Sequence, residues 1–171
     1  MIEALFQDKL LKPKARTEQL CQWLLDQKIS LKELIAFART AKDSPQATCV
    51  EALEFATRRD PSVADATVWN FACESLLAKA PRVKWESAKV IGNIAHCFPR
   101  QVDQAITPLL SNAEHTGTVV RWSAAFALCA ILQLKTKWNK ELLPAIESMA
   151  ASETNNAVRK QYLAVLKELK K

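Results

Sequence analysis

The stretch VRW at Val120–Trp122 decides the fold, because closely similar stretches lie on either side of it. VKW stands 37 residues earlier, at Val83–Trp85, and VRK stands 38 residues later, at Val158–Lys160. Similarity that returns at an interval of about 20–50 residues is typical of proteins built from stacked structural repeats. The sequence therefore predicts a chain of repeats that pile on one another.

Each of these stretches opens a segment with the periodicity of an α-helix. The apolar stripe that starts the middle copy consists of Val120, Ala124, Ala127, Leu128 and Ile131. The spacing i, i+4, i+7, i+8, i+11 places these side chains on one face of a helix. Comparable stripes follow Val83 and Val158, and a weaker copy begins at Cys49. We expect each copy to be the second helix of a helix pair.

A first helix is expected before each of these second helices. Leu31–Ala41 is the earliest, and Ser30 and Glu33 have the spacing of a capping box at its start. Ser44 and Pro45 then offer an N-cap and a first-turn proline for the helix that follows. The later first helices are predicted near residues 62–79, 101–113 and 138–151.

The residues before the repeats also show helical spacing. The segments Ile2–Leu11 and Thr17–Gln27 are predicted to form an N-terminal helical cap over residues 1–29, with the repeats spanning 30–171. A chain of 171 residues is of the usual size for one domain, so residues 1–171 are expected to form a single domain.

The pattern resembles the HEAT-repeat family. The resemblance depends on the Val-Arg or Val-Lys pair that opens each second helix, the small residues after it, and Pro108 and Pro144 in the first helices. It covers about residues 30–171 and is strongest from residue 82. It implies an all-α fold, a right-handed superhelix (HEAT-like solenoid) of about four helix pairs plus the capping helices. It also implies that second helices line the concave side and that the protein is an interaction scaffold.

The basic residues of the repeated pair have two interpretations. In the family, this residue commonly joins a ladder of ion pairs between repeats, and Lys84, Arg121 and Arg159 occupy its position. Glu114 and Glu153 are the candidate acidic partners, because they lie just upstream of Arg121 and Arg159. Alternatively, the three basic side chains contact the phosphates of a ligand.

A second set of side chains lies opposite the apolar stripe, because a helix turns by 100° per residue. If the fold is HEAT-like, these side chains face the concave groove. The partner-binding residues predicted there are Trp85, Lys89, Trp122, Phe126, Lys160 and Lys167. The tryptophans either wedge between neighbouring second helices, as stacked repeats require, or serve as exposed anchors, as aromatic residues do in binding hot spots.

Two functions follow from this face. The first is a non-catalytic scaffold that binds a protein or peptide through an aromatic and basic groove. The second is nucleic-acid binding, as a relative of the HEAT-like DNA alkylation-repair glycosylases, since rings can stack on bases while lysines contact phosphates. In that family the groove also holds a carboxylate. None of the predicted groove positions is Asp or Glu, and Glu86 is expected to the side, so the sequence disfavours the glycosylase.

Composition sets further bounds. The net charge of +6 permits attraction to acidic surfaces or nucleic acid, but the basic residues form no long run. No segment reaches the length and apolar character of a signal-peptide core or a membrane span, so no membrane partner is expected. The cysteines, interpreted as small buried hydrophobes in a reducing compartment, are Cys21, Cys49, Cys73, Cys97 and Cys129. A cytoplasmic location is therefore expected.

Chemistry-bearing motifs are sparse. The two glycines, Gly92 and Gly117, stand alone and make no phosphate-binding loop. His96 and His115 have no cysteine or carboxylate at metal-ligand spacing, so neither a metal nor a small-molecule cofactor is expected. No catalytic residues can be named, and the sequence does not identify the partner.

Overall fold

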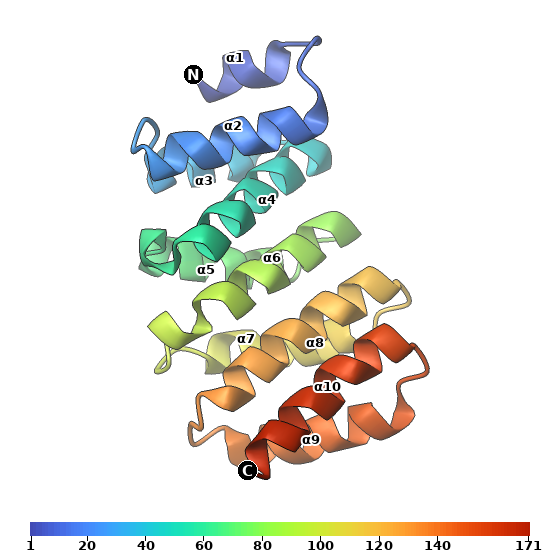
Figure 1. Ribbon diagram of the computed structural model, residues 1–171. Helices are drawn as coiled ribbons and strands as arrows, with labels where there is room; N and C mark the ends of the chain where they lie inside the picture. The colour runs from blue at the N-terminus through green and yellow to red at the C-terminus, as the bar shows by residue number, and fades with distance from the viewer.

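The computed structural model describes all 171 residues, and every regular element in it is helical (Figure 1). The elements are α1 (Ile2–Gln7), α2 (Pro13–Leu25), α3 (Leu31–Thr40), α4 (Asp43–Arg59), η1 (Pro61–Val63), α5 (Ala66–Ser75), α6 (Pro81–Ile94), η2 (Ala95–Cys97), α7 (Asp103–Ala113), α8 (Thr118–Gln133), α9 (Asn139–Ser152) and α10 (Asn156–Leu169). The structure is an α-solenoid, which confirms the predicted fold class.

The helices form two layers along the stack (Figure 1). The second helices α2, α4, α6, α8 and α10 pack on one another in sequence order, whereas the first helices α3, α5, α7 and α9 make few contacts with one another. The pairs α3/α4, α5/α6, α7/α8 and α9/α10 are the four predicted repeats.

Local sequence explains where the helices begin. The predicted capping box is present: the Ser30 hydroxyl accepts a hydrogen bond from the Glu33 amide at 3.1 Å, and the Glu33 carboxylate accepts one from the Ser30 amide at 2.7 Å. The prediction that Ser44 caps the next helix was wrong. The backbone is extended at Lys42 and helical from Asp43, so Lys42 is the N-cap and Ser44 lies in the first turn.

The predicted apolar stripes form the core. Val83, Val120 and Val158, which open the three repeated segments, are all fully buried. Val83 and Val158 belong to a connected group of buried side chains that extends from Ile2 in α1 to Val165 in α10, and Val120 is buried beside it. Because each repeat covers the apolar side of its neighbour, the core runs the length of the stack.

The N-terminal helices continue both layers. Phe6 of α1 stacks on Phe37 of α3 with ring centroids 5.0 Å apart, while α2 packs on α4. The first two helices therefore extend the stack beyond the α3/α4 repeat. The division into a cap over 1–29 and repeats over 30–171 stays a prediction.

The cysteines differ in their surroundings. Cys21, Cys49 and Cys129 are buried as predicted, and burial raises the pKa of Cys49 and Cys129 to about 12. Cys73 is partly buried. The expectation for Cys97 was wrong: it is exposed, because η2 carries it beyond the end of the apolar stripe of α6. None of the helices combines the length and the apolar character that crossing a membrane requires.

Candidate partner-binding face

Equivalent positions on four second helices define one candidate surface, which we call the even-helix face. Positions i, i+4 and i+7 share one side of a helix. The residues of the even-helix face are Glu51, Phe55 and Arg58 of α4, Trp85, Lys89 and Gly92 of α6, Trp122, Phe126 and Cys129 of α8, and Lys160, Ala164 and Lys167 of α10. All six predicted partner-binding residues belong to this set.

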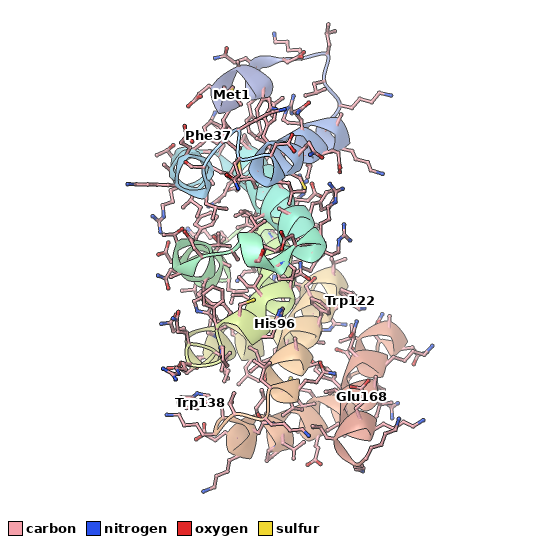
Figure 2. The ribbon with its side chains drawn as sticks, turned by 60° about the vertical axis from the view of Figure 1, so that its left-hand side comes forward. Met1, Phe37, His96, Trp122, Trp138 and Glu168 are labelled. Atoms are coloured by element: carbon pink, nitrogen blue, oxygen red, sulfur yellow. The ribbon has the colours of Figure 1, made fainter.

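The two tryptophans are neither sealed in the core nor fully exposed. Trp85 and Trp122 are both partly buried, and Trp122 packs against the core. Figure 2 shows Trp122 on the side of the even-numbered helices, whereas Trp138 lies on the other side of the stack. Each ring is therefore partly covered by the fold and partly accessible. Its role as a wedge or as an anchor stays a prediction.

Trp122 and Phe126 form a flat aromatic surface on α8. Their rings are parallel to within 4°, with centroids 5.9 Å apart. The Phe126 ring rests on Gly92 of α6, where an added Cβ would lie 2.3 Å from the ring atom Cε1. Only glycine leaves room for this ring. Gly92 is not among the six predicted partner-binding residues, although a lone glycine inside a helical pattern signals a close approach of backbone or side chain.

Two buried carboxylates lie next to Lys89 on the even-helix face. Glu86 accepts a hydrogen bond from the indole of Trp85 at 2.7 Å and one from the ammonium of Lys89 at 2.9 Å. The Lys89 ammonium also lies 3.6 Å from Glu54 Oε2, which comes from α4. The Glu54 and Glu86 side chains are only 2% and 5% exposed. Neither carboxylate occupies one of the six predicted groove positions, but Glu86, which was expected to the side, contacts two of them, Trp85 and Lys89.

This cluster is paired internally. Arg58 Nε lies 3.6 Å from Glu54 Oε1, and Asn93 donates a hydrogen bond to the Glu54 backbone carbonyl at 3.2 Å. Burying an unpaired charge is costly, so two carboxylates can lie here only because Lys89 and Arg58 balance them. Linear sequence concealed the pair because Glu54 and Lys89 come from neighbouring repeats, and their approach depends on how α4 and α6 are rotated.

The basic positions of α10 lie alongside α8. Lys160 and Lys167 are exposed, and α10 packs on α8. The Cys129 thiol donates to the backbone carbonyl of Gln161 at 3.5 Å. The same helix thus presents lysines to solvent next to the aromatic surface of α8.

A shallow hollow lies on α10 itself. It has a volume of about 170 Å³ and is lined by Asn156, Arg159, Lys160 and Leu163. Leu163 is 47% exposed, and Arg159 and Lys160 are also exposed. The hollow therefore offers an apolar floor with cationic groups at its rim.

Two of the three predicted phosphate contacts are engaged inside the fold. The Lys84 ammonium donates to the Leu76 carbonyl at 3.1 Å and to the Asn112 side chain at 3.0 Å. Arg121 donates to both carboxylate oxygens of Glu153, at 3.0 and 3.3 Å. This is the inter-repeat ion pair that the family resemblance implies, with Glu153 as the partner of Arg121.

The Arg121–Glu153 pair is largely shielded from water, with the two side chains 18% and 9% exposed. Burial raises the pKa of Glu153, but hydrogen bonds from Arg121 and from the Asn155 amide outweigh that effect and leave the pKa below its ordinary value. Arg159 is exposed. It is the one predicted phosphate contact that remains accessible.

Comparison with known proteins supports the fold but identifies no family. No protein-family model matches the chain, and no curated protein matches it. Several solved structures, in contrast, are similar to this chain. A designed armadillo repeat protein in complex with the peptide (KR)4 is 22% identical over 88% of this chain and 68% of its own, with a TM-score of 0.73.

Two further structures are similar. A computationally designed armadillo repeat protein for modular peptide recognition is 18% identical, covers 97% of this chain and 79% of its own, and has a TM-score of 0.74. A chain from the complex of CpcE and CpcF of phycocyanin lyase from Nostoc sp. PCC7120 is also 18% identical, covers 96% and 95%, and has a TM-score of 0.71. At such identities, the similarity establishes an armadillo-type helical repeat fold. It does not show the specific HEAT-like or DNA-repair relationship.

Proposed function

Starting from an armadillo-type helical repeat fold, we propose that this chain is a non-catalytic scaffold that binds a protein or peptide along the even-helix face. The observation that carries the proposal is the partly exposed aromatic surface of α8, where Phe126 rests on Gly92 and stacks with Trp122. Aromatic side chains held rigidly at a surface lose little entropy on binding and dominate interface energies.

The packing of the layers supports the choice of face. In a curved two-layer stack, the helices of the inner layer approach one another more closely than those of the outer layer. The second helices pack on one another in this way, whereas the first helices contact sparsely. We therefore place the even-helix face on the inner side of the curve, where repeat proteins have their extended binding surfaces.

The structural neighbours also support a peptide or protein as the ligand. One designed neighbour is in complex with the peptide (KR)4, another was designed for peptide recognition, and a third forms the complex of CpcE and CpcF. The buried carboxylates do not favour catalysis, because Glu86 is hydrogen-bonded to Trp85 and Lys89 and Glu54 lies next to Lys89.

The proposal is tested by selecting binders from a library of displayed random peptides against the whole chain. Selected peptides should bind Trp122→Ala at least about tenfold more weakly than the parent chain, since a truncated hot-spot aromatic costs about 2 kcal/mol or more. Trp138→Ala is the matched control, because this tryptophan lies on the other side of the stack (Figure 2). Thermal melts of both variants separate a loss of binding from a loss of folding.

Two outcomes would reject the proposal. One is that every selected peptide binds folded Trp122→Ala as tightly as the parent chain. The other concerns nucleic acid, the alternative function. Duplex DNA could bind in a titration, with an affinity that falls steeply as salt rises and with binding lost in Trp122→Ala. The even-helix face then serves nucleic acid instead.

A further inference from the structure

The accessible charge on the even-helix face has one sign. Its one carboxylate, Glu51, is largely buried and accepts hydrogen bonds from Thr17 and Arg82, both at 2.7 Å. In contrast, Lys160 and Lys167 are exposed, whereas Arg58 is paired with the buried Glu54 at 3.6 Å. A partner that approaches this face therefore meets cations and not carboxylates.

The buried acids do not reverse this sign. Glu54 and Glu86 are at most 5% exposed, and the ammonium of Lys89 lies within 3.6 Å of both. Their two charges are balanced by Lys89 and by Arg58, whose Nε lies 3.6 Å from Glu54 Oε1. The middle of the face is therefore close to neutral, and its main feature is the aromatic rings.

The charged and the aromatic residues of the face lie on different helices. Arg58 lies on α4, the aromatic surface of Trp122 and Phe126 lies on α8, and Lys160 and Lys167 lie on α10. The hollow on α10 adds Arg159 at its rim and Leu163 at its floor. The cationic groups that no carboxylate neutralises therefore gather on α10, beside the aromatic rings of α8.

We propose that the occupant of the even-helix face is an acidic peptide segment that carries an aromatic or large aliphatic residue close to its Asp and Glu residues. The apolar residue would pack on Trp122 and Phe126, and the carboxylates would pair with Lys160 and Lys167. Electrostatic complementarity of this kind sets specificity and association rate more than total affinity. The inference rests on the proposed function and names the chemistry of its ligand.

The test uses the peptides selected from the random library and a charge-reversed chain, Lys160→Glu/Lys167→Glu. The selected sequences should be enriched in Asp and Glu around an aromatic or aliphatic residue. Their affinity for the charge-reversed chain should fall by about tenfold or more, because two attractions become repulsions. Peptides resynthesised with Lys in place of Asp and Glu should regain affinity for that chain.

Lys9→Glu/Lys14→Glu is the matched control. These lysines are exposed near α1 and α2, at the opposite end of the stack, and the substitution changes net charge by the same amount (Figure 1). Its affinity for the peptides should stay close to that of the parent chain. Melting curves of both double variants show whether either substitution acts through folding.

The outcomes distinguish this inference from the proposed function. If selected peptides lose binding to Trp122→Ala but ignore charge reversal at Lys160 and Lys167, the acidic ligand is wrong while the peptide-binding face stands. Enrichment of basic peptides leads to the same conclusion. If no selected peptide responds to Trp122→Ala, the proposed function itself fails. The proposal of an acidic peptide is also overturned if duplex DNA binds the parent chain more tightly than every peptide does and fails to bind the charge-reversed chain.

Discussion

At the scale of single residues, Gly92 has the most specific structural role. It lies in the middle of α6, where glycine costs about 0.5–1 kcal/mol relative to alanine. The Phe126 ring occupies the space that a side chain would need. Glycine therefore weakens α6 at the position where the Phe126 ring of α8 packs against it.

Gly92→Ala is predicted to move that ring without removing any group that could contact a ligand. The new Cβ would start 2.3 Å from Phe126 Cε1, so the ring must shift outward and lose its parallel arrangement with Trp122. The unfolding free energy should change little, by about 1 kcal/mol or less, because better helix propensity offsets the strain. Peptide affinity should fall.

Urea unfolding and peptide titration of the Gly92→Ala chain measure the two effects. Gly117→Ala is the control, since the glycine there is the N-cap of α8 and lies away from the aromatic rings. Unchanged peptide affinity in Gly92→Ala would show that the position of Phe126 does not matter for binding.

At the scale of elements, polar contacts connect one repeat to the next. Arg39 of α3 donates to Glu74 of α5 at 2.8 Å, and Trp69 of α5 donates to Gln104 of α7 at 2.9 Å. Arg121 makes the corresponding contact across the last two repeats. Such contacts fix the rotation of each helix pair relative to its neighbour, which apolar packing alone specifies less sharply.

Glu153→Gln is predicted to destabilise the chain in a pH-dependent way. The folded-state pKa of Glu153 lies below its ordinary value of 4.5, so its contribution to stability is fully present above that pH. It is lost as the pH falls through the folded-state pKa. At neutral pH the substitution should cost about 1–2 kcal/mol, because a charged hydrogen bond to Arg121 becomes a neutral one.

Urea unfolding of both chains over a range of pH measures this difference. The parent chain and Glu153→Gln should converge in stability once the pH is well below 4.5. Glu147→Gln, an exposed change on the same helix, is the control and should show almost no cost at neutral pH. A cost for Glu153→Gln that does not shrink in acid would contradict an ion pair as its origin.

At the scale of the whole molecule, the stack has supported helices in the middle and less supported ones at its ends. α6 packs on both α4 and α8, whereas α10 packs on α8 and α9, and α1 lies at the other end of the stack (Figure 1). In repeat proteins, stability is close to a sum of each repeat and its interfaces with neighbours. Repeats with one neighbouring repeat should open more often than repeats with two.

Native-state hydrogen exchange should therefore be slowest in α4, α6 and α8. It should be fastest in α1 and in the last turn of α10, with free energies of opening well below the global value. Mass spectrometry of peptic fragments after exchange provides the measurement. Equal protection of α1 and α6 would show that the molecule unfolds as one unit.

The sequence by itself determined the repeats, the alternation of first and second helices, and the side of each helix that enters the core. It also predicted which helices carry the candidate face and the start of α3, because Ser30 and Glu33 are three residues apart. These features arise from helical periodicity and short-range hydrogen bonds, which neighbouring residues encode.

Only the tertiary structure decided which side chains meet across repeats. It brought Glu54 to Lys89, placed Phe126 on Gly92, and gave Arg121 the carboxylate of Glu153. Each of these contacts joins two helices that are distant in the chain. Their rotation and separation are set by the packing of the whole stack, so a few degrees of helix rotation change the partner while every local pattern stays the same.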